Sequence, residues 1–130
     1  MADERCECKA ASILVFPCSG GSNVGQMANA AAVEMTRQGK ANMYCLAGIG
    51  GHISGMVDSA AHADYRIAID GCQVACARKT LEHAGMPADR AVIVTALGIA
   101  KNHEFQWSDG ELRQVIEAAE EGMPASISEK

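Results

Sequence analysis

Short apolar runs alternate along this chain with longer segments in which apolar residues recur every three or four positions. Each run is apolar on both faces, as expected for strands buried in a parallel sheet. The four runs are 12–16, 42–46, 65–69 and 91–95. Strands that alternate with helices predict an α/β fold: a single three-layer domain with a mostly parallel four-stranded sheet flanked by helices, Rossmann-like or flavodoxin-like.

Helical spacing follows each predicted strand. A long helix is expected from Val24 to a stop at Gly39, and a shorter one over 53–60, after a glycine loop at 48–51. A third is expected to carry Cys72 and Cys76 in its first turns. Ser108 and Glu111 have capping-box spacing and predict the start of the last helix.

The domain is expected to span residues 12–122, preceded by a flexible segment at 1–11 and followed by a flexible tail at 123–130. Only 4% of residues are aromatic, so the core must consist of Ala, Val, Ile, Leu and Met. The net charge of −5 and the absence of a basic cluster exclude a typical nucleic-acid-binding surface. The sequence shows neither a secretory signal nor an apolar run that could cross a bilayer, so we expect a cytoplasmic protein that does not bind membranes.

Six cysteines are many for a chain of 130 residues in a reducing compartment, where structural disulfides are rare. Metal binding or thiol chemistry is therefore the leading expectation. Cys18, Cys45 and Cys72 fall at or just past the ends of predicted strands, and Cys76 lies one helical turn further on. Right-handed crossovers bring all these strand ends to one edge of the sheet, where such folds bind ligands. The four thiols should therefore meet.

Four thiolates in a tetrahedral arrangement favour zinc, although the same ligands suit an iron–sulfur cluster. The N-termini of the following helices would offset the negative charge. Lys79 is expected to add a positive charge beside Cys76, and Asp70 either supports a ligating cysteine or makes an Asx turn before the helix. The position at the ligand-binding edge suggests a sensing, carrying or exchange role.

Further ligands are weaker candidates. His52 follows the second glycine loop and could act as a fifth ligand or proton carrier. Cys6 and Cys8 form a CxC pair that could clasp a metal, though an unattached tail thiol is an equal alternative. His83 lies two helical turns beyond Cys76, about 10 Å along the axis, which is too far for the same ion.

The chain resembles the DGC-domain family at three segments: PCSGGSNVGQ from Pro17, YCLAGIGGHISG from Tyr44 and IDGCQVACARKTLEHAG from Ile69. The family takes its name from the Asp-Gly-Cys seen here at 70–72. The resemblance covers nearly the whole chain from Ser12 to the last helix. It implies a zinc-binding protein in which Cys18, Cys45, Cys72 and Cys76 correspond to the family's four proposed metal ligands.

Two other functions remain open from the residues alone. In a thiol–disulfide redox enzyme, Cys72 at a helix N-terminus would react first and Cys76 or Cys18 would be its disulfide partner. An iron–sulfur electron carrier would use the same four cysteines. The loop at 19–23 is not a Walker loop, since no Gly-Lys-Ser or Gly-Lys-Thr follows it, and the loop at 48–51 lacks the spacing for a nicotinamide cofactor.

Overall fold

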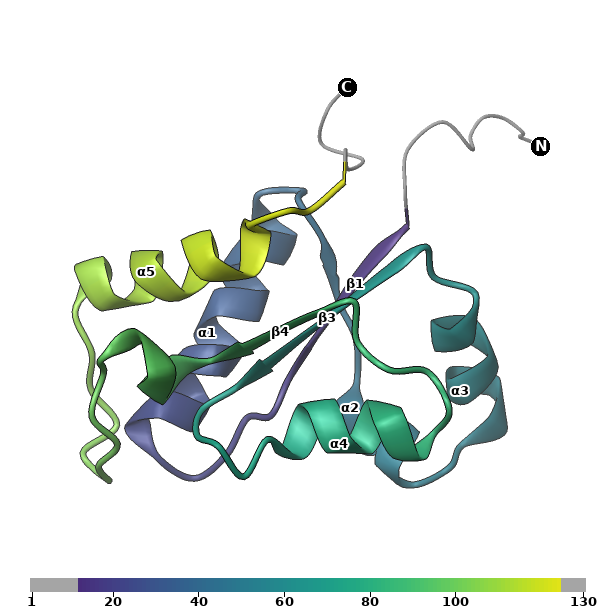
Figure 1. Cartoon of the computed structure of the whole chain (residues 1–130), viewed down its shortest axis with the longest axis horizontal. Helices are drawn as coiled ribbons and strands as arrows, with labels where there is room; N and C mark the ends of the chain where they lie inside the picture. Colours follow the sequence, from purple (N-terminus) through teal and green to yellow (C-terminus); the bar gives the residue numbers. More distant parts are fainter. Residues whose placement is uncertain (1–11, 125–130) are drawn as a thin grey trace.

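The computed structural model describes residues 12–124, in which strands and helices alternate (Figure 1). The elements, in chain order, are β1 (Ile13–Pro17), α1 (Asn23–Arg37), β2 (Asn42–Met43), α2 (Leu46–Gly50), α3 (Ser54–Ala61), β3 (Tyr65–Asp70), α4 (Cys76–His83), β4 (Arg90–Ile93), the 3-10 helix η1 (Val94–Leu97) and α5 (Asp109–Glu120).

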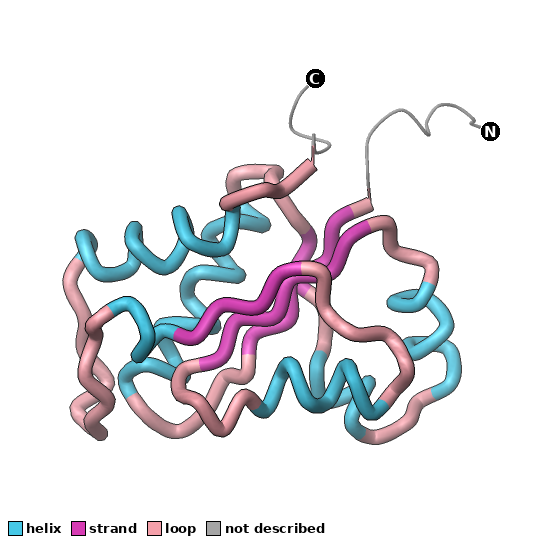
Figure 2. Tube along the Cα trace, in the orientation of Figure 1, coloured by secondary structure: helices cyan, strands magenta, loops and turns pink. Residues whose placement is uncertain are grey.

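The strands form one parallel sheet in the order β2-β1-β3-β4. Figure 2 shows β1, β3 and β4 running side by side, with β1 and β3 leading into loops and β4 into the short helix η1 at the same edge. The chain moves from β1 outward to β2 and then returns to place β3 on the other side of β1. The sheet's topological switch point therefore lies between β1 and β3, where open α/β sheets bind ligands. The predicted fold class is confirmed.

The two faces of the sheet bury separate apolar clusters because successive strand residues point to opposite faces. Ile13 and Val15 of β1 pack with α1 and α5, whereas Leu14 and Phe16 pack with residues of α2, α3 and α4. Figure 1 shows these two groups of helices on opposite sides of the sheet. Small and aliphatic residues dominate both clusters, with Phe16 the largest fully buried side chain.

Four elements differ from the sequence-based expectation. The second strand ends at Met43, and the predicted loop at 48–51 is mostly helix α2, because Leu46 and Ile49 are spaced to face the α4 side of the sheet together. Helix α4 begins at Cys76, so Cys72 lies in the turn before the helix and not within it. The fourth strand ends at Ile93 and continues as η1.

Other boundaries agree with the sequence. The capping box of α5 is confirmed: Ser108 Oγ accepts a hydrogen bond from the Glu111 backbone at 3.1 Å, and the Glu111 side chain accepts one from the Ser108 backbone at 3.0 Å. Gly39 has a φ of 75°, which suits the residue that follows a helix end. None of the helices within residues 12–124 is long and apolar enough to cross a membrane.

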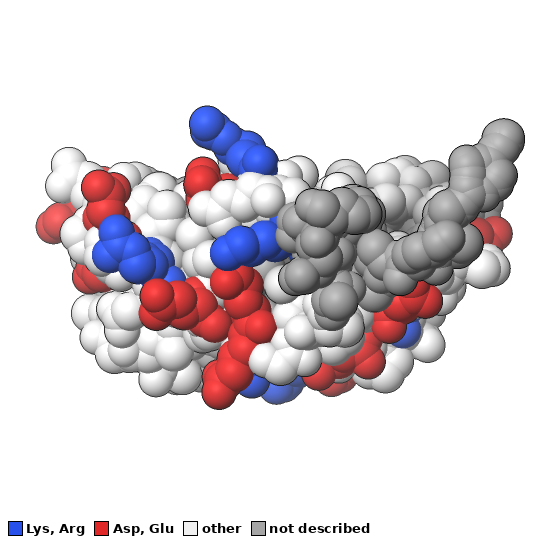
Figure 3. Space-filling model, turned by 90° about the horizontal axis from the view of Figure 1, so that it is seen from above, with Lys and Arg blue, Asp and Glu red and all other residues white. Residues whose placement is uncertain are grey.

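The C-terminal half of α5 is fixed to the rest of the domain by charged side chains. Lys40 pairs with Glu120 at 3.0 Å, and Arg90 pairs with Glu121 at 3.0 Å while also donating to the Ala118 carbonyl. On the face shown in Figure 3, Lys and Arg side chains lie beside Asp and Glu side chains.

A candidate metal centre at the switch point

Cys18 follows β1 directly and lies against the end of β3. Its backbone N–H donates to the Ile69 carbonyl at 3.0 Å, and its sulfur accepts a hydrogen bond from the Gly71 backbone at 3.4 Å. Burial raises the pKa of the Cys18 thiol, and the nearby Asp70 and Cys76 raise it further, while N–H groups of Gly71 and Gly20 act in the opposite direction. Cys18 is therefore a protonated thiol at neutral pH unless a cation binds it.

Two glycines let the backbones around Cys18 approach closely. A Cβ on Gly25 would lie 2.5 Å from the Gly20 carbonyl oxygen, and a Cβ on Gly71 would lie 2.7 Å from the Gly25 backbone nitrogen. Both distances are too short for any side chain. The first turn of α1 is thus in close backbone contact with both the loop after Cys18 and the Asp-Gly-Cys turn after β3, and so holds the segments of Cys18 and Cys72 near each other.

Asp70 organises the turn that carries Cys72. It is 2% exposed, and its carboxylate accepts hydrogen bonds from the backbone of Ala77 at 2.6 Å and Arg78 at 3.0 Å, in the first turn of α4. Ala75 precedes the helix in the left-handed conformation, with a φ of 58°, and has no side chain to cap it. Asp70 takes over that capping role from five residues earlier, so the Asp accounts for the position of Cys76 at the helix start.

Three of the four predicted ligands line one cavity, which we call the thiol pocket. The cavity has a volume of about 200 Å³ and lies at the N-terminal end of α1. Its lining residues are Cys18, Gly20, Gly21, Ser22, Gly25, Gly71, Cys72, Val74, Cys76 and Lys101. The sulfur-bearing walls come from the ends of β1 and β3 and the start of α4. The sequence-based expectation that strand ends gather cysteines thus accounts for this pocket.

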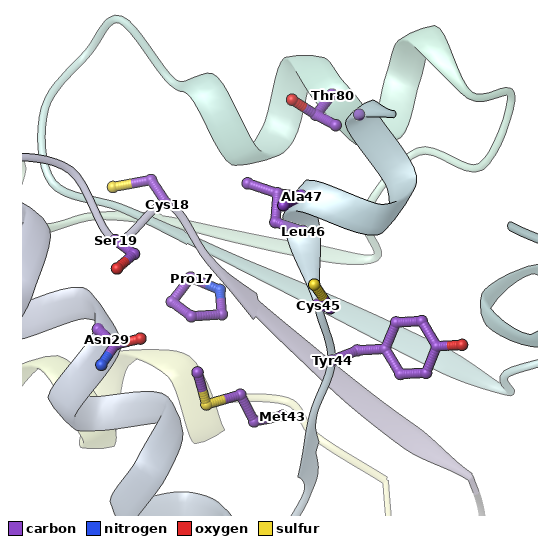
Figure 4. A pocket seen from close by; sticks show the side chains of 11 residues that line it. Pro17, Cys18, Ser19, Asn29, Met43, Tyr44, Cys45, Leu46, Ala47 and Thr80 are labelled. Atoms are coloured by element: carbon purple, nitrogen blue, oxygen red, sulfur yellow. The ribbon is translucent and has the colours of Figure 1, made fainter. Parts of the chain in front are cut away.

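Cys45 lies in a neighbouring cavity of about 440 Å³ that Cys18 also borders. Figure 4 shows this cavity: Cys45 stands at the start of α2, and the Cys18 side chain points away from it. Cys45 is exposed and does not line the thiol pocket. The structure therefore places Cys18, Cys72 and Cys76 around the thiol pocket and Cys45 in the neighbouring cavity.

Lys101 is the pocket residue that the sequence did not reveal. Its Nζ lies 3.7 Å from the Cys72 sulfur, and no periodic pattern marks the loop that carries it. The buried Asn23 holds that loop: its side chain donates to the Ala100 carbonyl at 2.9 Å and accepts from the Asn102 backbone at 2.6 Å. Lys79, the lysine expected beside Cys76, is exposed and does not line the pocket.

The weaker candidates lie elsewhere. His52 lines neither the thiol pocket nor the cavity at Cys45, and its ring instead meets that of His83. Cys6 and Cys8 lie outside the described residues. The Asp70 carboxylate is committed to the backbone of α4 and supports the turn as a helix cap.

The donor chemistry of the thiol pocket fits a thiolate-preferring metal ion, since it offers three sulfurs, a backbone N–H aimed at one of them and a lysine beside another. Within residues 12–124, however, no three His, Cys, Asp or Glu side chains are gathered closely enough to hold an ion. Binding would have to draw the sulfurs inward. The four-cysteine ligand set therefore stays a prediction.

The fold and the site together define a class of protein: an α/β domain with a cysteine-lined pocket at the switch point of its sheet. The chain matches the DGC domain over residues 14–119 and belongs to that family. It is also similar to the Anaerobic and virulence modulator AnvM of Pseudomonas aeruginosa, with 41% identity over 68 residues. That match spans 52% of this chain and 52% of the relative. No solved structure matches the chain.

Proposed function

We propose that the thiol pocket binds a single zinc ion through the thiolates of Cys18, Cys72 and Cys76, with Cys45 drawn in as the fourth ligand. The observation that carries the proposal is that three thiols from separate elements line one cavity of about 200 Å³. Zinc holds thiolate sulfur at about 2.3 Å in tetrahedral sites, and cysteines from strand ends and a helix start can supply that geometry.

The surroundings of the pocket suit thiolates. The Gly71 N–H already points at the Cys18 sulfur, and Lys101 places a positive charge 3.7 Å from the Cys72 sulfur. The N-terminal end of α1 adds a partial positive charge to the same cavity. These groups offset part of the negative charge that four thiolates would bring around a divalent ion.

Titration with Cd²⁺ tests the proposal, because cadmium–thiolate bonds produce a charge-transfer absorption in the ultraviolet. We expect one ion per chain, competition by Zn²⁺, and a large loss of affinity in Cys18→Ser, Cys72→Ser and Cys76→Ser. Cys45→Ser should weaken binding as well if Cys45 completes the set. The double variant Cys6→Ser/Cys8→Ser tests separately whether the CxC pair contributes to binding. Equal affinity in all these variants would contradict the proposal.

We infer a sensing or exchange role for this site in a reducing cytosol. Cys76 is exposed, and Cys18 and Cys72 lie in the segments that follow β1 and β3, so ion binding should change the conformation of the loops around the pocket. The P. aeruginosa relative is named an anaerobic and virulence modulator, and a thiolate site that loses its ion on oxidation would suit a protein that responds to oxygen.

Thiol–disulfide chemistry is the second candidate, favoured by the contact between Lys101 and the Cys72 sulfur. A cation beside an accessible thiol is typical of reactive cysteines. In this reading Cys72 attacks a disulfide of a substrate protein, displacing one of its sulfurs as a thiolate. Cys76 or Cys18 then attacks the mixed disulfide, releasing the reduced substrate and leaving an intramolecular disulfide.

Counting free thiols before and after a chelator separates these functions. Thiols that become reactive only after chelation indicate a metal site, whereas one hyperreactive thiol that a chelator leaves unchanged indicates redox chemistry. An iron–sulfur cluster would reveal itself by visible absorption in anaerobically purified protein, which zinc does not give.

A further inference from the structure

His52 and His83 meet at a site that the thiol pocket does not use. Their ring centres are 5.4 Å apart and the rings are inclined by 66°. His52 lies in the turn after α2, and His83 is the last residue of α4. Both side chains are exposed, so a solvated ion can reach them. No sequence pattern predicts that these two residues meet.

The separation of the rings matches what one metal ion imposes on two imidazoles. A tetrahedral ion that holds each ring nitrogen at about 2.0–2.1 Å places the ring centres roughly 5 Å apart. The observed 5.4 Å is within a few tenths of an ångström of this geometry. To bind one ion together, each ring would turn a nitrogen toward the space between the two rings.

Both histidines are carried by rigid parts of the domain. The turn at His52 is held by backbone hydrogen bonds from His52 to Ile49 at 3.0 Å and from Ile53 to Gly48 at 3.1 Å. Ile49 of α2 and Leu81 of α4 are buried in the same apolar cluster, so the two elements are packed together beneath the pair. Such support means that little order has to be gained when an ion binds.

The backbone of His52 adds to this pre-organisation. Its φ of 59° is in the left-handed region, which side chains other than those of Asn, Asp and His rarely adopt. Replacement by Asn therefore removes the imidazole without a new backbone penalty, which makes Asn the appropriate test residue.

We propose that His52 and His83 form a second metal site, for imidazole-preferring divalent ions such as Ni²⁺, Cu²⁺ or Zn²⁺, with the remaining coordination positions open to water or an outside ligand. Two imidazoles give a weaker and more exchangeable site than four thiolates. Cys76 and His83 are at opposite ends of α4, about 10 Å apart along the helix axis, so the two sites would bind separate ions.

Titration of the full-length chain with NiCl₂, followed by the NMR signals of the histidine rings, tests this site without relying on the cysteines. The His52 and His83 signals should broaden together at lower Ni²⁺ than those of His62 and His103. Because the second ligand of a chelate binds within the same molecule, His52→Asn or His83→Asn should weaken the binding by about 100-fold. His103→Asn, which removes an exposed histidine outside the pair, should leave it unchanged.

The proposal is overturned if His52→Asn binds Ni²⁺ as tightly as the unaltered chain, or if all four histidines broaden alike. Either result would leave the thiol site untouched, because Cd²⁺ absorption reports on sulfur ligands alone. Circular dichroism of His52→Asn and His83→Asn establishes that the variants are folded. If His83→Asn proves unfolded, His52→Asn alone decides the question, because its loop position and the tolerance of Asn preserve the backbone.

Discussion

Asp70 is the residue on which the geometry of the candidate site most depends. Its two carboxylate oxygens satisfy two backbone N–H groups of α4 that no other group caps. We predict that Asp70→Ala lowers the free energy of unfolding by about 2 kcal/mol, since it leaves the buried Ala77 N–H and the partly buried Arg78 N–H without a partner. Asp70→Asn keeps one acceptor and should cost less. Urea denaturation measures both, and an unchanged midpoint for Asp70→Ala would contradict the capping role.

The same carboxyl group predicts a pH dependence. Burial raises the pKa of Asp70 above its ordinary value of 3.8, even though the N–H groups of Ala77 and Arg78 and the positive charges of Arg78 and Lys79 oppose the shift. A raised pKa means that the folded state binds the proton more tightly than the unfolded state. Stability from this group is therefore complete below 3.8 and is lost as the pH rises through the folded pKa. Asp70→Asn should lack this component, so denaturation series in acid that run parallel for both proteins would contradict it.

In the metal-free protein, the Cys18 thiol should be alkylated slowly. Because burial raises the pKa of its thiol and limits access to its sulfur, Cys18 should react more slowly with iodoacetamide at neutral pH than the exposed Cys45. The difference should narrow as the pH approaches the raised pKa. Mass spectrometry of peptides after timed alkylation measures both rates, and equal rates at neutral pH would contradict the prediction.

The position of a single residue could be predicted from the sequence where the pattern of apolar runs places that residue at the end of a strand. Cys18 follows an apolar strand, so its position at the sheet edge follows from the topology alone. Lys101 and Asn23 could not be predicted, because the first belongs to a loop without periodicity and the second reaches across to that loop, 77 residues away from Ala100. Contacts between such distant segments arise only from tertiary packing.

At the scale of elements, the junction of the first loop with α1 is set by a glycine. A Cβ at Gly25 would lie 2.5 Å from a backbone oxygen, whereas one at Gly55, in α3, meets nothing within 4 Å. We predict that Gly25→Ala destabilises the fold by more than about 2 kcal/mol and distorts the thiol pocket, because backbone must move. Gly55→Ala should stabilise by about 0.5–1 kcal/mol through helix propensity. Thermal unfolding of the Gly25→Ala and Gly55→Ala variants measures both effects. If the two substitutions changed the melting temperature in the same direction, the close backbone contact at Gly25 would be contradicted.

Elements could be predicted from sequence where local signals agreed. The capping box of α5 and the long apolar stripe of α1 were sufficient to place both helices. Helix α2 was missed because three glycines in 48–51 are typical of a loop, whereas burial of Ile49 stabilises a short helix there. The start of α4 was misplaced by four residues because Asp70 caps it from a distance, which local spacing cannot show.

At the scale of the whole molecule, metal binding should be linked to folding. An ion that binds only the folded chain stabilises it by about 2.7 kcal/mol when its free concentration is 100 times the dissociation constant. Zinc should therefore raise the melting temperature of the unaltered chain, and EDTA should reverse the effect. Cys72→Ser should lose most of this shift. A melting temperature indifferent to zinc would contradict binding at a site formed by β1, β3 and α4.

The alternation of strands and helices along the sequence was sufficient to predict the fold of the whole molecule. It was not sufficient to predict which cysteines line one pocket. Parallel order and strand-end placement bring three thiols to one pocket, but the direction of each side chain depends on turns such as the one that Asp70 holds. Cys45 illustrates the difference: it stands at the predicted edge and yet lines the adjoining cavity.

X-ray absorption at the zinc edge of the anaerobically purified, zinc-loaded chain tests the central claim most directly, because it reports the atoms bound to the metal. We predict one zinc per chain with a shell of sulfur at about 2.3 Å, in which each of Cys18→Ser, Cys72→Ser and Cys76→Ser reduces the sulfur count. A shell made only of nitrogen and oxygen, or a sulfur shell unchanged in all three variants, would contradict it.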